Sequence, residues 1–504
     1  MQDKSILIIG AGFAGLAAGI YAQMNGYRSQ IYEMHTLPGG LCTAWKRKGY
    51  TIDGCIHWLV GSSPQSASNR IWREVGVAQG REFVNADEYM RYEGADGRTV
   101  IFYSNIDRLE QHLIALSPKD EAVIREFTRA VRLGIALDQQ PTDQDAPLVK
   151  LGKAIRLGWT FLTCRKDLMR WMNTSTDQFV ERIQDPLLRE AFKSTWPSNF
   201  SMIFMAFTFS YLSDQNAGYP IGGSLPMSQA LEQRYLGLGG QIHYSQRVEK
   251  ILVEHDRAVG IRLADGSEVR AGRVISAADG HATIFDMLDG RYTDEKVREP
   301  YEKWPVFPSL VYVGLGVNRT FADEPKTVSG ISFPLRQPQE IGGEQVERID
   351  AHIFNQDPTL APPGKTALTV MLTADYAYWK ELGRDPAAYT EKKDQIARQI
   401  VAALEERFPG IGGQIEMVDV ATPLTFERYT GNWKGSFEGF MITPENANVI
   451  LKPMSQRLPG LENFYMCGQW VEPGGGLPTG IMSGRRLLQA VCKEDNQRFI
   501  SRAD

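Results

Sequence analysis

One stretch near the start of the chain limits the fold more than any other. From Lys4 to Glu33 it reads KSILIIGAGFAGLAAGIYAQMNGYRSQIYE. Ser5–Ile9 is almost continuously apolar, which is typical of a strand buried on both faces of a parallel sheet. The alanine-rich segment Leu16–Asn25 predicts a helix that Gly26 ends, and Arg28–Glu33 predicts a second strand. The stretch therefore predicts a unit of strand, helix and strand.

The turn between the first strand and the helix carries the pattern GAGFAG at residues 10–15. Gly10 permits a tight turn, Gly12 lets the backbone approach a pyrophosphate, and Gly15 lets the helix pack closely on the strand. The helix N-terminus offers free N–H groups and a positive dipole end to phosphates. Glu33, at the end of the second strand, is placed to accept hydrogen bonds from ribose hydroxyls. The pattern favours dinucleotide binding, and the alternative is an ordinary turn between strand and helix.

Composition excludes several other classes of protein. The chain has 504 residues and a net charge of −5 with both signs spread along it, so a nucleic-acid partner is not expected. Its five cysteines never have CxxC spacing, and no metal-ligand cluster stands out, so we expect no metal. A predicted strand starts at Ser5, which leaves no room for a signal peptide, and no apolar run is long enough to span a bilayer. We expect a cytoplasmic protein.

The far end of the chain carries a second glycine-rich loop, in LENFYMCGQWVEPGGGLPTGIMSGRR. Phe464–Cys467 predicts a buried strand, and a helix is expected to begin near Thr479 and Gly480. A helix N-terminus after a glycine loop is another anion site. A flavin ring gains negative charge along its N1–C2=O edge on reduction, so such a helix would stabilise the reduced form. We therefore expect the two ends of the chain to meet around one flavin nucleotide.

Further segments link these ends. PGGLCTAWKRKGYTIDGCIHWLVG, residues 38–61, adds a second glycine turn and a short strand at Tyr50–Asp53. In the middle of the chain, residues 219–279 predict a helix, a strand at Val248–Glu254, a hairpin and a buried strand at Arg273–Ala277. No second GxGxxG unit follows, which argues against a reductase with a separate pyridine-nucleotide domain.

These segments resemble the flavin amine-oxidase clan, and within it the branch of phytoene desaturases, carotenoid isomerases and retinol saturases. The resemblance covers both ends and the middle of the chain, and TPLTFERYTGNWKGSFEG near Thr422 adds a weaker match. It implies FAD as the cofactor and an α/β fold in which a Rossmann-like FAD-binding domain is interleaved with an α+β substrate-binding domain. The helical part of the substrate domain is then an insertion.

The resemblance and the glycine patterns together give a set of expected FAD contacts, which extends from the first glycine loop to the last helix. Besides Gly10, Gly12, Gly15 and Glu33, the set is Phe13, Ala14, Met34, Gly39, Gly40, Leu41, Thr43, Ile56, His57, Trp58, Val248, Ser276, Ala277, Gly468, Gln469, Gly480, Ile481 and Ser483. Two candidates for direct roles in catalysis are His57, beside the flavin ring, and Tyr429, facing the substrate channel; the alternative for each is a structural role.

The expected domains are discontinuous. We predict an FAD-binding domain over residues 1–74, 220–305 and 421–504, and a substrate domain over residues 75–219 and 306–420, with residues 110–215 mainly helical. Within that helical part, Phe200–Tyr211 is aromatic and methionine-rich, as in a core or a tunnel for a long apolar molecule. Asp138–Pro147 is expected to be a polar loop.

The function expected from these features is hydride transfer between FAD and a long apolar isoprenoid or polyene, by desaturation, saturation or isomerisation. Two alternatives stay open: a flavin amine oxidase, and a non-catalytic carrier of prenylated partners like the Rab-escort proteins. The intact glycine pattern and Glu33 speak against the carrier. Residues 153–172 mix basic residues with tryptophans, so this segment is a candidate for peripheral membrane contact. The sequence leaves the oligomeric state open.

Overall fold

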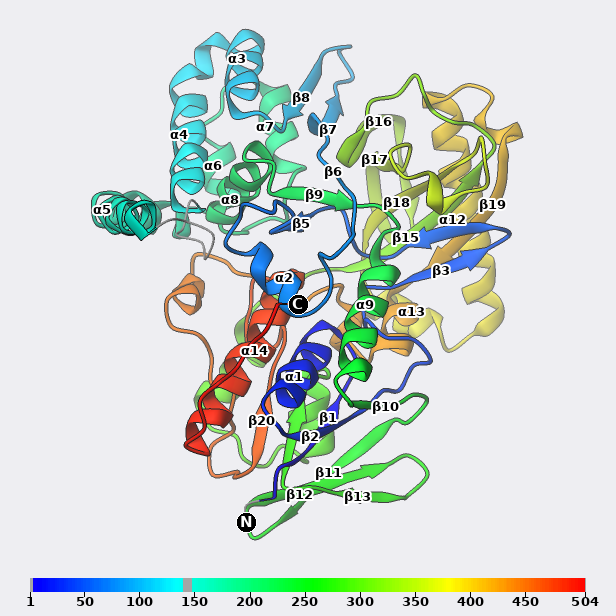
Figure 1. Ribbon diagram of the computed structural model, residues 1–504. Coiled ribbons are helices and arrows are strands. Elements are labelled where there is room, and N and C mark those ends of the chain that lie inside the picture. Colours follow the sequence, from blue (N-terminus) through cyan, green and yellow to red (C-terminus); the bar gives the residue numbers. More distant parts are fainter. Residues whose placement is uncertain (1–2, 139–146, 504) are drawn as a thin grey trace.

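The computed structural model describes residues 3–138 and 147–503. A five-stranded parallel sheet lies in the lower half of the view in Figure 1, in the spatial order β10-β2-β1-β14-β20. Its strands come from the start, the middle and the end of the chain. They are β1 (Ser5–Ile9), β2 (Arg28–Tyr32), β10 (Gln241–His243), β14 (Arg273–Ser276) and β20 (Phe464–Met466).

The two faces of this sheet are covered by different layers. Successive side chains along β1 point to opposite faces, so they contact these layers in turn. Ile6 and Ile8 pack under the helices α1 (Phe13–Met24), α9 (Ser224–Gly237) and α14 (Leu477–Glu494). Leu7 and Ile9 pack on the opposite side, against an antiparallel sheet. That sheet consists of β11 (Val248–Glu254), β12 (Arg257–Leu263) and β13 (Glu268–Arg270).

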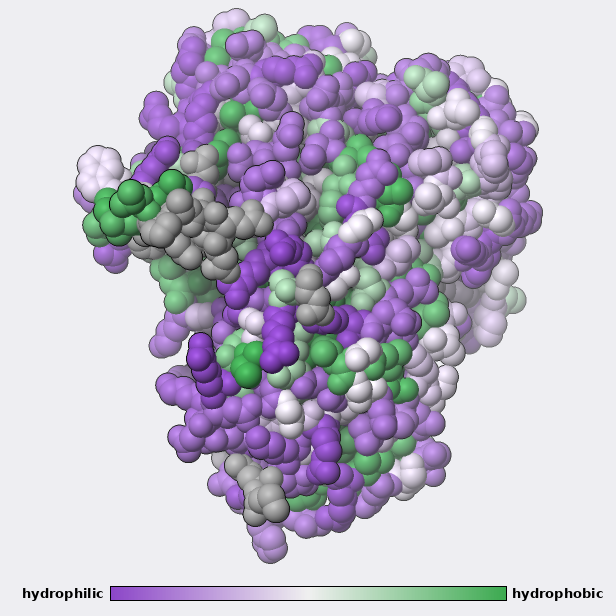
Figure 2. All heavy atoms as spheres, in the orientation of Figure 1, coloured by the Kyte–Doolittle hydropathy of each residue, from purple (hydrophilic) through white to green (hydrophobic). Residues whose placement is uncertain are grey.

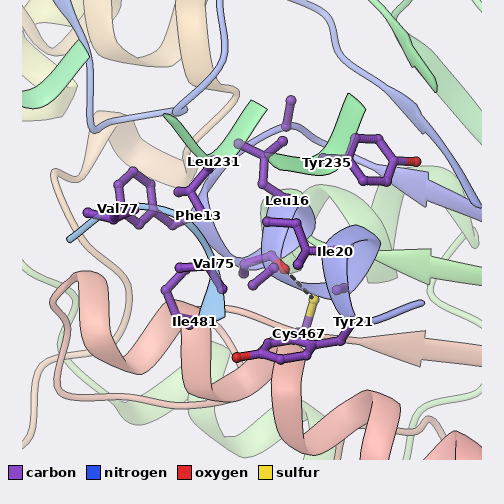
Figure 3. Packing of buried hydrophobic residues seen from close by; sticks show 14 of the residues in the cluster. Phe13, Leu16, Ile20, Tyr21, Val75, Val77, Leu231, Tyr235, Cys467 and Ile481 are labelled. Atoms are coloured by element: carbon purple, nitrogen blue, oxygen red, sulfur yellow. Dashed lines mark hydrogen bonds between the residues drawn. The ribbon is translucent and has the colours of Figure 1, made fainter. Parts of the chain in front are cut away.

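Helix α1 is buried along almost its whole length. Figure 3 shows Phe13, Leu16 and Tyr21 among residues from α9 and α14, with Cys467 donating its S–H to the carbonyl of Ala14 at 3.9 Å. Cys467 is a core residue, and its burial raises the pKa of the thiol. The helix starts at Phe13, three residues before the predicted start, because Gly12 caps it directly.

A second, seven-stranded sheet is built from two segments far apart in the sequence. Its spatial order is β19-β15-β18-β17-β16-β7-β8. The strands are β7 (Glu88–Glu93), β8 (Thr99–Tyr103), β15 (Ser309–Val317), β16 (Thr327–Ile341), β17 (Glu344–Ile353), β18 (Thr366–Ala374) and β19 (Ile415–Ala421). Helix α12 (Pro386–Arg407) buries Ile396, Ile400 and Leu404 against one face. The other face is turned toward the FAD-binding segments, because Gly314 lies against Ile52: a Cβ placed on Gly314 would be 2.7 Å from the Ile52 side chain.

Helices cover the end of this sheet at β7 and β8 (Figure 1). They are α3 (Ile106–Leu116), α4 (Glu121–Asp138), α5 (Pro147–Met172), α6 (Thr176–Val180), α7 (Pro186–Lys193) and α8 (Met202–Ser213). The methionine-rich segment forms α8 and is largely core, with Met205 and Phe209 buried against α4 and β8. Most of the predicted polar loop, residues 139–146, lies outside the described residues.

Shorter elements complete the structure. They are β3 (Ala44–Arg47), β4 (Tyr50–Asp53), β5 (Leu59–Val60), β6 (Phe83–Val84), β9 (Ala217–Pro220), α2 (Asn69–Glu74), α10 (Glu295–Lys303), α11 (Tyr376–Leu382) and α13 (Pro423–Thr430). The predicted α/β fold class is confirmed. The domain boundaries stay a prediction, although the sheet shared by β7, β8 and β15–β19 is the arrangement expected of one substrate domain.

Candidate flavin site

The N-termini of α1 and α14 lie side by side, which brings the two ends of the chain together. Gly484 touches α1 so closely that a Cβ there would lie 2.7 Å from the Ala18 nitrogen. A Cβ on Gly480 would lie 3.6 Å from the Ala14 nitrogen, and one on Gly468 3.3 Å from the Ala14 Cβ. Since α1 and α14 each start at a glycine with no side-chain cap, both have free N–H groups at this place.

The first glycine loop is enclosed by segments that the sequence placed near the nucleotide. Gly39 donates its N–H to the Ala11 carbonyl at 2.9 Å, so the second glycine turn lies against the first. Ala277 donates to the Ile9 carbonyl at 2.9 Å, and a Cβ on Gly15 would meet the Ala277 Cβ at 3.2 Å. At these glycines the backbone segments approach one another too closely for larger residues.

Glu33 is fixed at the end of β2. Its carboxylate accepts the Ala11 N–H at 2.7 Å through Oε2 and the His35 N–H at 2.8 Å through Oε1. Burial raises the pKa of the carboxyl, although these backbone donors oppose the shift. The Glu33 carbonyl accepts the Gln246 N–H at 2.9 Å, which brings the strand that starts at Val248 alongside it. Each carboxylate oxygen keeps a further lone pair for a ligand hydroxyl.

Most of the remaining predicted contacts lie either at the loop after β20 and the start of α14, or in the loops beside Gly12 and Gly39. Gly468 donates its N–H to the buried Ser483 hydroxyl at 2.9 Å, so the loop after β20 is tied to α14. Met34, Gly40, Leu41 and Thr43 belong to the loops beside Gly12 and Gly39, and Gln469 and Ile481 belong to the loop and helix at Gly468 and Gly480. Ser276 is buried and shares a hydrogen bond with Thr283 at 2.7 Å.

His57 belongs to a segment held by Asp53, a buried carboxylate. Asp53 accepts hydrogen bonds from the Ser224 hydroxyl at 2.6 Å and from the Ile56 N–H at 3.1 Å. The His57 ring stacks on His352 at 5.2 Å, and burial lowers the pKa of His57 to about 4. His57 is therefore a neutral imidazole at pH 7, which suits a hydrogen-bonding contact better than an acid that gives up an imidazolium proton.

Tyr429 lies elsewhere. It is on α13, 48% exposed, and its ring meets His35 edge-on at 5.0 Å. This position is next to the Glu33 segment rather than beside His57. A role for Tyr429 facing the substrate channel stays a prediction.

Sequence reasoning missed Glu438. Its carboxylate accepts the Gly476 N–H at 3.1 Å at the start of α14, and a Cβ on Gly475 would collide with it. Burial raises the pKa of this carboxyl from 4.5 to about 7. A carboxyl that exchanges its proton near neutral pH, beside the loop where the flavin ring is expected, is a candidate acid or base. Glu438 belongs to the weaker match near Thr422, but nothing in that segment indicated that its carboxyl would be buried beside the last glycine loop.

Aromatic rings form a wall from His57 to the last glycine loop. Trp58 meets Trp196 edge-on at 6.5 Å, Trp196 stacks on Phe200 at 5.2 Å, and Phe200 meets Phe204 at 5.0 Å. A Cβ on Gly474 would lie 3.1 Å from Phe204. We call Trp58, Trp196, Phe200 and Phe204 the aromatic wall. A separate hollow of about 780 Å³ is lined by polar residues such as Arg73 and Asp138. None of the expected FAD contacts is among its lining residues.

Comparison with known proteins identifies the family. A family model described as "Flavin containing amine oxidoreductase" matches residues 13–492. The chain belongs to this family. Among its relatives are the chloroplastic prolycopene isomerase of Arabidopsis thaliana, 24% identical over 98% of this chain and 84% of that protein, and the lycopene-forming phytoene desaturase of Pseudescherichia vulneris, 25% identical over 98% of this chain and all of that protein.

Solved structures agree on the fold. Cyclohexylamine oxidase from Brevibacterium oxydans is 14% identical, covers 98% of this chain and 100% of its own, and superposes with a TM-score of 0.62. An oxidoreductase from Methanosarcina mazei is 17% identical, over 96% and 100% of the two chains, with a TM-score of 0.60. At such identities the likeness concerns the fold alone. As a member of this flavoprotein family, the chain is an oxidoreductase, and its cofactor is FAD.

The residues present fit that cofactor. Gly12 has extended backbone (φ −70°, ψ 176°), and a Cβ there would meet no atom within 4 Å, which leaves open space in front of the α1 N-terminus. The N-termini of α1 and α14 would hold the pyrophosphate and the ring, and Glu33 would hold the ribose. Within the described part of the chain, no three His, Cys, Asp or Glu side chains are grouped to hold a metal ion.

Gly12→Val tests this placement without disturbing the fold. Since the backbone there suits any residue and the space is open, the variant should fold with an unchanged melting temperature but bind FAD at least about 100-fold more weakly, because the side chain would occupy the pyrophosphate position. The visible absorbance of the purified protein and titration of the FAD-free form measure this. Gly413→Val, also in open space but at the exposed end of the short 3-10 helix Ile411–Gly413, is the control. A fully yellow Gly12→Val protein would contradict the placement.

Glu438→Gln tests the proton on that carboxyl. Because the folded-state pKa of about 7 lies above 4.5, the unfolded state releases this proton first, and stability is lost as the pH rises from 4.5 to 7. The amide cannot ionise, so the variant should melt about 2–4 °C higher than the wild type at pH 8, with a smaller difference at pH 5. Differential scanning calorimetry at both pH values measures this. The exposed Glu249→Gln is the control; an equal gain at both pH values would rule out the raised pKa.

Proposed function

We propose that this FAD-dependent oxidoreductase acts on a long, apolar isoprenoid or polyene substrate. The observation that carries the proposal is the aromatic wall, which runs from Trp58 beside His57 to Phe204 at the Gly474 loop. Trp58, Trp196 and Phe204 are only partly buried and offer apolar surface to an extended chain of carbon atoms, with Phe200 packed among them in the core. Relatives named prolycopene isomerase and phytoene desaturase support the same substrate class.

The chemistry needs few protein groups. FAD, when bound, accepts or returns a hydride at N5 while a proton leaves or joins the neighbouring carbon of the substrate. We propose that Glu438 holds or moves that proton. Its pKa is raised to about 7, and its carboxylate accepts the Gly476 N–H just before α14 begins. His57, which stays neutral, positions the substrate or the ring by hydrogen bonding. The aromatic wall excludes water from the reacting carbons.

A flavin amine oxidase is the second candidate, because solved relatives of the same fold include cyclohexylamine oxidase and putrescine oxidase. Absorbance under anaerobic conditions separates the two candidates. We expect cyclohexylamine and putrescine to leave the oxidised flavin band unchanged, while a polyene either bleaches the oxidised protein or restores the colour of the dithionite-reduced protein. Chromatography of the polyene then reveals a change in double bonds. Bleaching by the amines, with no response to polyenes, would overturn the proposal.

We also propose that helix α5 rests on a membrane surface, from which such a substrate is taken. Residues spaced three or four apart on α5 are exposed, among them Ile155 (64%), Trp159 (70%) and Leu162 (77%). Figure 2 shows hydrophobic residues gathered where α5 projects from the molecule. The helix also carries Arg156, Arg165 and Lys166, with a single acid at Asp167, so anionic lipid complements its charge.

Every helix within residues 3–138 and 147–503 is too short or too polar to span a bilayer, so this contact would be peripheral.

Trp159→Glu combined with Leu162→Glu tests the membrane contact. Both side chains are exposed, so the variant should keep its FAD and its melting temperature but partition at least about tenfold more weakly onto vesicles of anionic phospholipid. Sedimentation with the vesicles measures the partition. Leu236→Glu combined with Ile500→Glu, which introduces the same two charges at side chains that are 40% and 39% exposed outside α5, is the control. Equal sedimentation of the double variant and the control would contradict the proposal.

A further inference from the structure

A small polar cavity lies in the substrate sheet beside His57. It has a volume of about 160 Å³ and is lined by Met90, Ser194, Thr195, Ser329, Ile331, Asp350, His352, Thr369 and Met371. The lining comes from four neighbouring strands, β7, β16, β17 and β18, which lie side by side in Figure 1, and from the loop after α7. We call it the polar cavity. It is too small for a whole substrate and suits one end of a long molecule.

The cavity contains buried polar atoms that lack partners. His352 and Thr369 are each 2% exposed and lie directly opposite each other across the β17–β18 pair. Neither ring nitrogen of His352, nor the hydroxyl of Thr369, makes a hydrogen bond of good geometry within the described residues, although the Thr327 backbone lies near His352 and the Tyr312 hydroxyl lies near Thr369. Buried polar groups without partners cost stability, so they are rarely kept unless a ligand or water satisfies them.

Asp350 adds an acceptor to the same place. It lies two residues before His352 on β17, opposite Ser332, and its exposed side chain lines the open side of the cavity. Desolvation by the neighbouring protein raises the pKa of its carboxyl, and the Ser332 hydroxyl and the Arg348 charge partly oppose this shift. Burial and the neighbouring His57 hold the pKa of His352 well below its usual value, so His352 is neutral.

The polar cavity lies next to the aromatic wall. Ser194 and Thr195 line the cavity, and the next residue, Trp196, belongs to the wall. On the other side, His352 stacks on His57, whose neighbour Trp58 begins the wall. An apolar molecule lying along the wall would therefore end at the polar cavity. A pure hydrocarbon would leave Thr369 and His352 unsatisfied there.

We propose that the polar cavity binds a hydroxyl group at the end of the apolar substrate. A hydroxyl both donates and accepts, so it can donate to Asp350 or a His352 nitrogen and accept from Thr369. Asp350 and Arg348 carry opposite charges beside the cavity, so neither a carboxylate nor an ammonium is favoured by both, and an ammonium could not accept a hydrogen bond from Thr369. The substrate class is thus an isoprenoid or polyene alcohol rather than a hydrocarbon. This inference rests on the proposed function.

Binding of three matched ligands to the FAD-loaded protein tests the inference. They share one polyene tail and end in a hydroxyl, a hydrogen or an amine. Quenching of tryptophan fluorescence, from the wall residues Trp58 and Trp196, measures each dissociation constant. We expect the alcohol to bind about 10–100-fold more tightly than the hydrocarbon, because a site built to hydrogen-bond a hydroxyl rejects the analogue that lacks it.

Thr369→Val keeps the shape of the side chain and removes its hydroxyl. It should weaken binding of the alcohol about tenfold and leave binding of the hydrocarbon unchanged, so that the preference shrinks. Thr373→Val, on the same strand but outside the cavity lining, is the control and should keep the preference.

Each other result has a distinct meaning. Equal affinity for alcohol and hydrocarbon, with both bound, would mean that the cavity holds only water, and the inference would be wrong while the proposed function stands. Tightest binding of the amine would also overturn it and favour the amine oxidase. Failure of all three tails to bind would refute the proposed function itself, and with it this inference.

Discussion

Close packing of α1 on α14 is the contact on which the rest of the structure depends. Gly484 allows the two helices to approach until a Cβ would collide with the α1 backbone, and Gly468 and Gly480 continue this contact toward the helix starts. Because both helices begin at uncapped glycines, their free N–H groups and positive dipole ends point to one place. A single dianionic cofactor can then be held by both ends of the chain.

The second sheet adds a different kind of surface beside this site. One face is sealed by α12 with aliphatic side chains, whereas the other carries polar residues such as Asp350, His352 and Thr369. The aromatic wall approaches the same place from the helical segment. His57 lies where the two meet, held by the Asp53 carboxylate through the backbone. Apolar surface that ends at a polar cavity matches the proposed substrate, which is a long apolar molecule with a hydroxyl at one end.

Much of the FAD-binding part could be predicted because its signals are local. β1, β4 and β11 have the predicted positions, since the pattern of apolar side chains along a strand acts over a few residues. Helix starts were less accurate: α14 begins at Leu477 rather than near Thr479, as Pro478 fits its first turn. Tyr429 has no such local signal, so its position beside His35 could not be predicted from the sequence.

The sequence by itself determined the family, the α/β fold class and the FAD cofactor, because glycine spacing and a following acid encode phosphate and ribose contacts within one strand–helix–strand unit. Only the tertiary structure decided which groups share the substrate side. The Glu438 carboxylate meets the Gly476 N–H from 38 residues away, and His352 meets His57 across almost three hundred residues; no sequence pattern links either pair. Burial then sets their pKa values, and burial depends on what the whole chain packs around each group rather than on its neighbours in sequence.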